Sequence, residues 1–134
     1  KKSSVINISG GGATKHREFF SAYSVSKTGI VRLTENLSKE YSDTKMNFFV
    51  VAPGVMKTKM FFKTNLKKLL KNYSKNISFT NPSENYDLIK MLIYQNNNKL
   101  SGKLLSVKWD KWKNLKFIKR IQKNEDTLTL RRKI

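Results

Sequence analysis

Two short apolar runs separated by a helical pattern constrain the fold of this chain more than any other feature. Residues 4–8 and 46–52 are rich in β-branched and aromatic side chains, and a glycine-containing turn follows each run, as is typical of buried strands. Between them, Ile30, Leu33 and Leu37 recur at spacings of three and four, which predicts a helix over residues 21–41. Strand, helix and strand in this order form a βαβ unit, so we expect parallel strands in an α/β fold.

A tyrosine and a lysine stand at the start of the predicted helix. Tyr23 and Lys27 are four residues apart, so in a helix their side chains share one face. An ammonium group beside a phenol favours the phenolate, which makes the pair suitable for proton transfer. Such pairs also occur on many helices without a catalytic role, so their surroundings decide between the two interpretations. Ligands of parallel sheets bind beyond the carboxyl ends of the strands, which is where Ser9, Pro53 and the start of this helix are expected to meet.

These residues in this order resemble the short-chain dehydrogenase/reductase family. The resemblance is carried by Tyr23 and Lys27, by the strand that ends at Ser9, and by the run from Val51 to Met60. It continues through residues 101–107, which are similar to the last strand of that family's sheet, and through residues 129–132. The resemblance implies the carboxyl-terminal part of a doubly wound, Rossmann-type parallel sheet that lacks the amino-terminal cofactor-binding half. We expect one partial domain over residues 1–134, with a basic tail over residues 113–134.

The resemblance also implies a reaction. Members of the family transfer a hydride between NAD or NADP and a small alcohol or carbonyl substrate, and they are commonly dimers or tetramers through the helix that carries Tyr23. In this chain the implied catalytic residues are Tyr23 as acid and base, Lys27 as its partner and a ligand of the nicotinamide ribose, and Ser9 as the group that holds the substrate oxygen. The implied contacts along the nicotinamide are Pro53, Gly54, Val55 and Thr58.

Two departures from the family pattern leave alternatives open. Gly10 stands where a serine is expected thirteen residues before Tyr23, and Ser9 is one position early. In a regular strand the side chain of Ser9 points to the opposite face, unless the glycines bend the chain. The pyrophosphate loop and the residue that selects NAD or NADP would lie in the half that this chain lacks. A noncatalytic remnant that acts as an interaction module therefore remains an alternative.

The amino-acid composition excludes some classes of site and argues against others. The chain has 134 residues, no cysteine and one histidine, His16, so disulfides, thiol chemistry and a histidine-rich metal site are excluded. No apolar run approaches the roughly 20 residues of a membrane span and no signal peptide is recognised, so we expect a cytoplasmic protein. The net charge of +19 suits nonspecific attraction to nucleic acid, although no zinc-finger spacing or aromatic RNA-binding motif supports that alternative. Because a strand follows directly on the first residues without an initiating Met, we expect a fragment or a truncated product.

The remaining segments predict helices and packing residues. Residues 61–73 have the spacing of an amphipathic helix, which the family uses as a mobile substrate lid and which could also lie on a membrane surface. A second helix is expected to open at Asn81 and Pro82. Trp109 and Trp112 are expected to pack or to contact another subunit, and a further helix is expected between residues 115 and 121.

Overall fold

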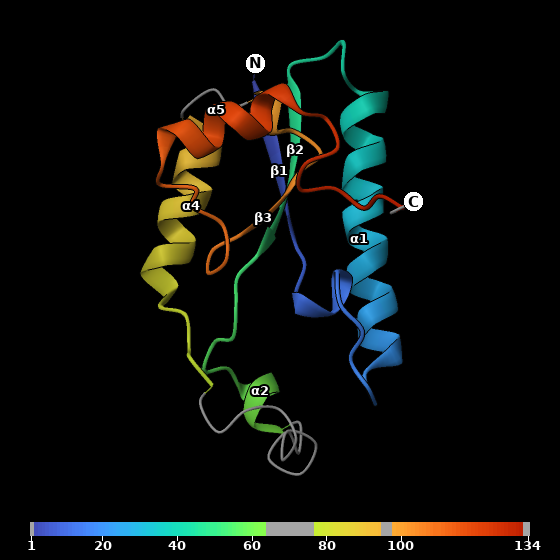
Figure 1. Ribbon diagram of the computed structural model, residues 1–134, viewed down its shortest axis with the longest axis vertical. Coiled ribbons are helices and arrows are strands. Elements are labelled where there is room, and N and C mark those ends of the chain that lie inside the picture. The colour runs from blue at the N-terminus through green and yellow to red at the C-terminus, as the bar shows by residue number, and fades with distance from the viewer. Residues whose placement is uncertain (1, 64–76, 95–97, 133–134) are drawn as a thin grey trace.

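The computed structural model describes residues 2–63, 77–94 and 98–132. In these residues, three strands alternate with helices and short 3₁₀ turns along the chain (Figure 1). In chain order the elements are β1 (Ser3–Ile8), η1 (Gly11–Ala13), α1 (Ser21–Glu40), β2 (Met46–Ala52), α2 (Lys59–Lys63), α4 (Pro82–Tyr94), η3 (Asn98–Leu100), β3 (Leu104–Ser106) and α5 (Leu115–Lys123).

The described strands form one parallel sheet in the order β1-β2-β3. β1 pairs with β2 from Ser3 opposite Met46 to Ile8 opposite Val51, and the last residues of β2 pair with β3. The predicted βαβ unit is therefore confirmed. Because β1 and β2 end side by side, the two loops that follow them start at the same edge of the sheet.

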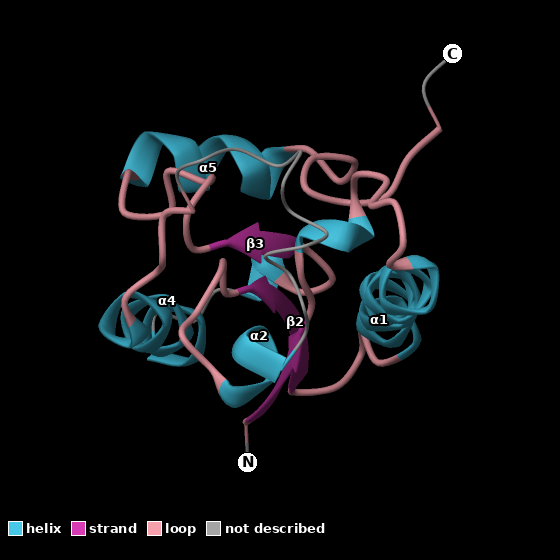
Figure 2. Ribbon diagram, turned by 90° about the horizontal axis from the view of Figure 1, so that it is seen from below, coloured by secondary structure: helices cyan, strands magenta, loops and turns pink. Residues whose placement is uncertain are grey.

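The sheet is covered on both faces, with α1 on one side and α4 and α5 on the other (Figure 2). Phe49 and Val51 of β2 pack into a core with Leu88 and Ile121, and Val50 packs with Val31 of α1 on the opposite face. Side chains of successive strand residues point to opposite faces. A central strand buried on both faces requires a continuous apolar run, which explains why residues 48–51 contain no polar residue.

Polar contacts fix α1 against β1. The Asn7 side-chain amide donates to Thr34 Oγ1 at 2.9 Å, and Ser9 Oγ donates to the carbonyl of Lys27 at 3.0 Å. Ser9 and Thr34 are both buried, so each hydroxyl needs its partner in order to offset its loss of water. These bonds set the position of α1 along β1, and therefore the height of Tyr23 above the sheet.

The carboxyl-terminal residues pack onto the sheet and onto α1. The predicted helix is present as α5, with Ile118 and Ile121 buried. The buried Lys103 ammonium donates to the carbonyls of three residues in the turn after α5, at 2.8–3.2 Å. Farther on, Arg131 forms an ion pair with Glu35 of α1 at 2.6 Å. Much of the segment expected to be a basic tail is thus attached to the fold.

Other predicted elements agree with the structure to different degrees. The helix expected at Asn81 is α4, and Asn81 Oδ1 accepts from Ser83 N while Glu84 accepts from Asn81 N, as in a capping box. Trp112 is buried and donates to a carbonyl, as expected of a packing residue, whereas Trp109 is exposed. β3 is shorter than the expected strand over residues 101–107, because Gly102 turns the chain with a φ of 84°. Of the amphipathic segment 61–73, residues 64–73 lie outside the described residues.

Candidate functional site

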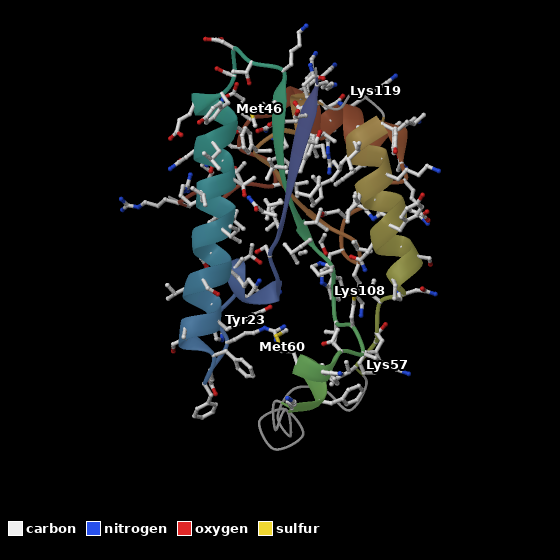
Figure 3. All side chains as sticks on the ribbon, turned by 180° about the vertical axis from the view of Figure 1, so that it is seen from behind. Tyr23, Met46, Lys57, Met60, Lys108 and Lys119 are labelled. Carbon is white, nitrogen blue, oxygen red and sulfur yellow. The ribbon has the colours of Figure 1, made fainter. Side chains whose placement is uncertain are left out.

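The predicted acid–base pair lies at the carboxyl edge of the sheet. Tyr23 is in the first turn of α1, at the end of the molecule opposite Met46, where β2 begins (Figure 3). Lys27 Nζ lies 5.8 Å from the centroid of the Tyr23 ring and donates to the carbonyl of Ile8 at 3.0 Å. Ile8 is the last residue of β1, so the strand end holds the ammonium group on the side of α1 that carries the phenol.

The glycine loop after β1 supports the Tyr23 ring. A Cβ atom at Gly10 would collide with Tyr23 Oη and would lie 3.2 Å from Cζ, and a Cβ at Gly12 would lie 3.2 Å from two other ring carbons. The ring therefore packs against backbone that carries no side chains. This contact explains why glycine stands at position 10, where the family pattern has a serine: in this arrangement the phenol occupies the space that a side chain would need.

Ser9 lies at the end of β1 and is hydrogen-bonded to α1. Its side chain is buried, and its hydroxyl donates to the carbonyl of Lys27. Ser9 N also donates to the Val51 carbonyl at 2.8 Å, so both polar groups of Ser9 bond to neighbouring backbone. The role of Ser9 in holding a substrate oxygen stays a prediction, and it would require the hydroxyl to exchange its bond to Lys27 for one to the substrate.

The second loop of the site follows β2. Gly54 has a φ of 77°, a conformation that favours glycine. The Val55 carbonyl accepts from Thr80 N at 2.8 Å. Thr58 Oγ1 accepts from Phe61 N at 3.2 Å, so Thr58 caps the start of α2.

Two residues that sequence reasoning missed hold this loop. Asn85 of α4 donates from its amide to the Pro53 carbonyl at 3.3 Å, and Thr80 is buried directly against Gly54. The loop following β2 therefore rests on the start of α4, about thirty residues later in the chain. No local pattern marks Thr80 or Asn85; only the spacing of the polar residue Asn85 within the apolar face of α4 could have drawn attention to it.

The candidate site consists of the Tyr23–Lys27 pair and the two loops that follow β1 and β2. Among the described residues, no group of three His, Cys, Asp or Glu side chains could hold a metal ion. In the same part of the chain, no helix has both the length and the apolar character needed to cross a membrane. The chemistry available at the edge of the sheet is that of a phenol, an ammonium group and exposed backbone groups.

Comparison with known proteins assigns the family. Residues 1–69, which include β1, α1, β2 and the loop up to Thr58, match the family model described as short chain dehydrogenase. The chain belongs to the short-chain dehydrogenase family. This match covers both loops of the site and the Tyr23–Lys27 pair between them. None of the curated proteins compared with the chain matches its sequence.

Solved structures agree on the fold. A variant of actinorhodin polyketide ketoreductase with NADPH has 21% identity and a TM-score of 0.68, over 79% of this chain and 46% of that one. 4-Hydroxyisoleucine dehydrogenase complexed with NADH has 19% identity and a TM-score of 0.61, over 77% and 43%. A short chain dehydrogenase from Salmonella enterica serovar Typhi has 17% identity and a TM-score of 0.63, over 80% and 42%. The chain thus spans less than half the length of these proteins and is a partial form of their Rossmann-type fold.

Proposed function

We propose that this chain forms the proton-transfer side of an NAD- or NADP-dependent oxidoreductase acting on a small alcohol or carbonyl compound. The observation that carries the proposal is the placement of the Tyr23 phenol over the glycine loop, with the Lys27 ammonium group on the same side of α1. Family membership adds the class of reaction. By the same resemblance we expect the complete enzyme to be a homo-oligomer, either a dimer or a tetramer, and we keep the cytoplasm as its expected location.

The residues present fit the nicotinamide end of such a cofactor. Within the described chain, the Ile8 carbonyl is the one hydrogen-bond acceptor of Lys27 Nζ, so two of its three N–H groups can bind ribose hydroxyls. Gly54 brings the backbone close to a ligand because it has no side chain, and Pro53, Val55 and Thr58 follow the same loop. When bound, the cofactor supplies or accepts the hydride.

The chain's own part in the reaction is to move a proton. In the direction of reduction, Tyr23 Oη donates a hydrogen bond to the carbonyl oxygen and gives up its proton as that oxygen becomes an alcohol. The positive charge of Lys27 stabilises the negative charge that grows on the phenol oxygen. Packing against Gly10 and Gly12 restricts the ring to one position, which supplies the orientation that such a step requires.

A second candidate is a noncatalytic member of the family that serves as an interaction module. One observation favours it: the Ser9 hydroxyl is used within the fold, and Gly10 supplies none. A carbonyl oxygen would then receive its hydrogen bond from Tyr23 with no help from a serine. The two candidates differ in whether nicotinamide reaches the carboxyl edge of the sheet.

Saturation-transfer NMR of the purified chain with NADH and with NADPH tests the proposal. We expect saturation of the nicotinamide protons, weakened in Lys27→Met and kept in Tyr23→Phe, because the lysine binds and the tyrosine reacts. Lys119→Met is the matched control, since it removes the same charge from α5 at the other end of the molecule (Figure 3). Absence of nicotinamide saturation, or an equal loss in Lys119→Met, would overturn the catalytic proposal. Any carbonyl reduction that is detected should disappear in Tyr23→Phe.

A further inference from the structure

A cavity lies at the edge of the sheet opposite to Tyr23, where the strands begin. It has a volume of about 590 Å³, and its walls include Met46 at the start of β2. Figure 3 shows Met46 at one end of the molecule and Tyr23 at the other. The volume falls within the range of about 300–1,000 Å³ that small-molecule sites occupy. The Tyr23 site accounts for none of these wall residues.

Cationic side chains predominate in this cavity. Its walls carry two carboxylates, Glu35 and Glu125, and six basic groups, which are Lys2, Lys39, Lys45, Lys99, Lys103 and Arg131. Charges of one sign around a concave surface reinforce one another and attract an opposite charge. The balance of these groups therefore indicates an anionic ligand.

Both carboxylates are already neutralised within the fold. Glu35 forms ion pairs with Arg32 at 2.5 Å and with Arg131 at 2.6 Å, and Glu125 pairs with Lys39 at 3.2 Å. The buried cation of the cavity, Lys103, donates to backbone carbonyls. Both carboxylates of the cavity are therefore already paired with basic side chains of the protein.

Three lysines remain without an acidic partner among the residues that the structure describes: Lys2, Lys45 and Lys99. They come from separate elements, since Lys2 precedes β1, Lys45 precedes β2, and Lys99 lies in η3. All three are exposed. A ligand that bridged them would hold three segments of the fold together.

The cavity also offers a buried amide. Asn47 of β2 lines it and is only 5% exposed, and its side-chain amide has no hydrogen-bond partner in the described part of the chain. The polar atoms of this amide are not sealed from solvent, so Asn47 adds a polar group that a ligand in the cavity can reach.

We propose that this cavity binds a small anion with several phosphate groups. Phosphate oxygens suit both lysine ammonium groups and amide N–H donors, and a multivalent anion matches three separated charges better than a monovalent one. A concave site of this volume favours a small molecule over nucleic acid, which would need an extended basic surface. The ligand would stabilise the folded chain in proportion to its concentration.

Titration calorimetry and thermal unfolding with inorganic triphosphate, at constant ionic strength, test this site. We expect saturable binding of one triphosphate per chain and an increase in Tm that sulfate does not reproduce. The double variant Lys45→Gln/Lys99→Gln should weaken binding at least tenfold. Lys57→Gln/Lys108→Gln is the matched control, because it removes two lysines that lie outside the cavity, and it should bind as the wild type does.

Each contrary outcome overturns the proposal in a different way. Equal weakening in both double variants would mean that the general charge of the chain attracts triphosphate. Tighter binding of a short DNA duplex, with displacement of triphosphate, would assign the surface to nucleic acid. Absence of saturable binding would remove the site altogether. Circular dichroism of each variant establishes that a loss of binding is not a loss of fold.

Discussion

Substituting Gly54 by alanine should destabilise the fold through two separate effects. Gly54 has a φ of 77°, where a side chain costs about 1–2 kcal/mol. An added Cβ would also collide with Thr80 Oγ1 and would lie 3.2 Å from Thr80 Cβ. Thr80 is buried, so it has little room to move, and overpacking of this kind costs about 1–3 kcal/mol. We expect Gly54→Ala to lower the free energy of unfolding by about 2–5 kcal/mol.

The two effects can be separated with a second substitution. Thr80 Oγ1 makes no hydrogen bond within the described residues, so Thr80→Ala removes the obstacle without breaking one. In the double variant Gly54→Ala/Thr80→Ala, the free energy of unfolding should rise by about 1–3 kcal/mol relative to Gly54→Ala, because the collision is removed. The loss caused by the backbone conformation of residue 54 should remain. Urea unfolding at a constant m-value measures all four proteins of this cycle.

Gly29→Ala supplies the matched control. Gly29 lies within α1, and a Cβ there would meet nothing within 4 Å. Alanine in the interior of a helix is more stable than glycine by roughly 0.5–1 kcal/mol, so this variant should be slightly more stable than the wild type. If Gly54→Ala behaves like Gly29→Ala, or if Thr80→Ala restores none of the lost stability, the account of the β2 loop is wrong.

Two further predictions concern pH. Burial raises the pKa of the Asp110 carboxyl above its ordinary value of 3.8, although the hydrogen bond from Ser106 N acts in the opposite direction. In the pH window between 3.8 and this raised pKa, the folded chain binds more protons than the unfolded chain. The free energy of unfolding therefore falls as pH rises through that window. Asp110→Asn should therefore gain stability relative to the wild type as pH increases through that window, and urea unfolding from pH 3 to 7 would contradict this if the difference stayed constant. Burial lowers the pKa of the Lys103 ammonium below 10.5, so the unfolded chain binds more protons in the window below that value and stability rises with pH. The stability of the wild type relative to Lys103→Met should increase through that alkaline window, and a flat difference between pH 8 and 10.5 would refute the assignment.

The elements that the sequence predicted well have local signals. β2 is a continuous apolar run, α1 has regular spacing, and the cap of α4 is encoded by Asn81 and Glu84 within one turn. The place of Tyr23 at the edge of the sheet followed from topology alone, because parallel strands end together. Each of these inferences needed only the period of one segment or the order of neighbouring segments.

Other features depend on contacts between distant parts of the chain. The hydrogen bond from Asn85 to the Pro53 carbonyl joins segments about thirty residues apart. No sequence pattern within either segment predicts this bond. The carboxyl-terminal residues look like a basic tail because lysines surround Ile118 and Ile121. Their attachment depends on Lys103, which looks like a surface residue in the sequence but donates to three carbonyls in the structure.

In the glycine loop, the residue at position 10 affects the positions that the neighbouring side chains can adopt. With glycine at position 10, the Tyr23 ring lies against the backbone, and the hydroxyl of Ser9 is used in holding α1. A serine at position 10 would require the phenol to move, because its Cβ would need the space that Tyr23 Oη occupies. The position of Tyr23 in this structure therefore depends on the glycine that replaces the family's serine. Catalysis by this chain, as proposed, would place the substrate oxygen against Tyr23 without a serine partner, so the proton donor must also be the group that positions the substrate.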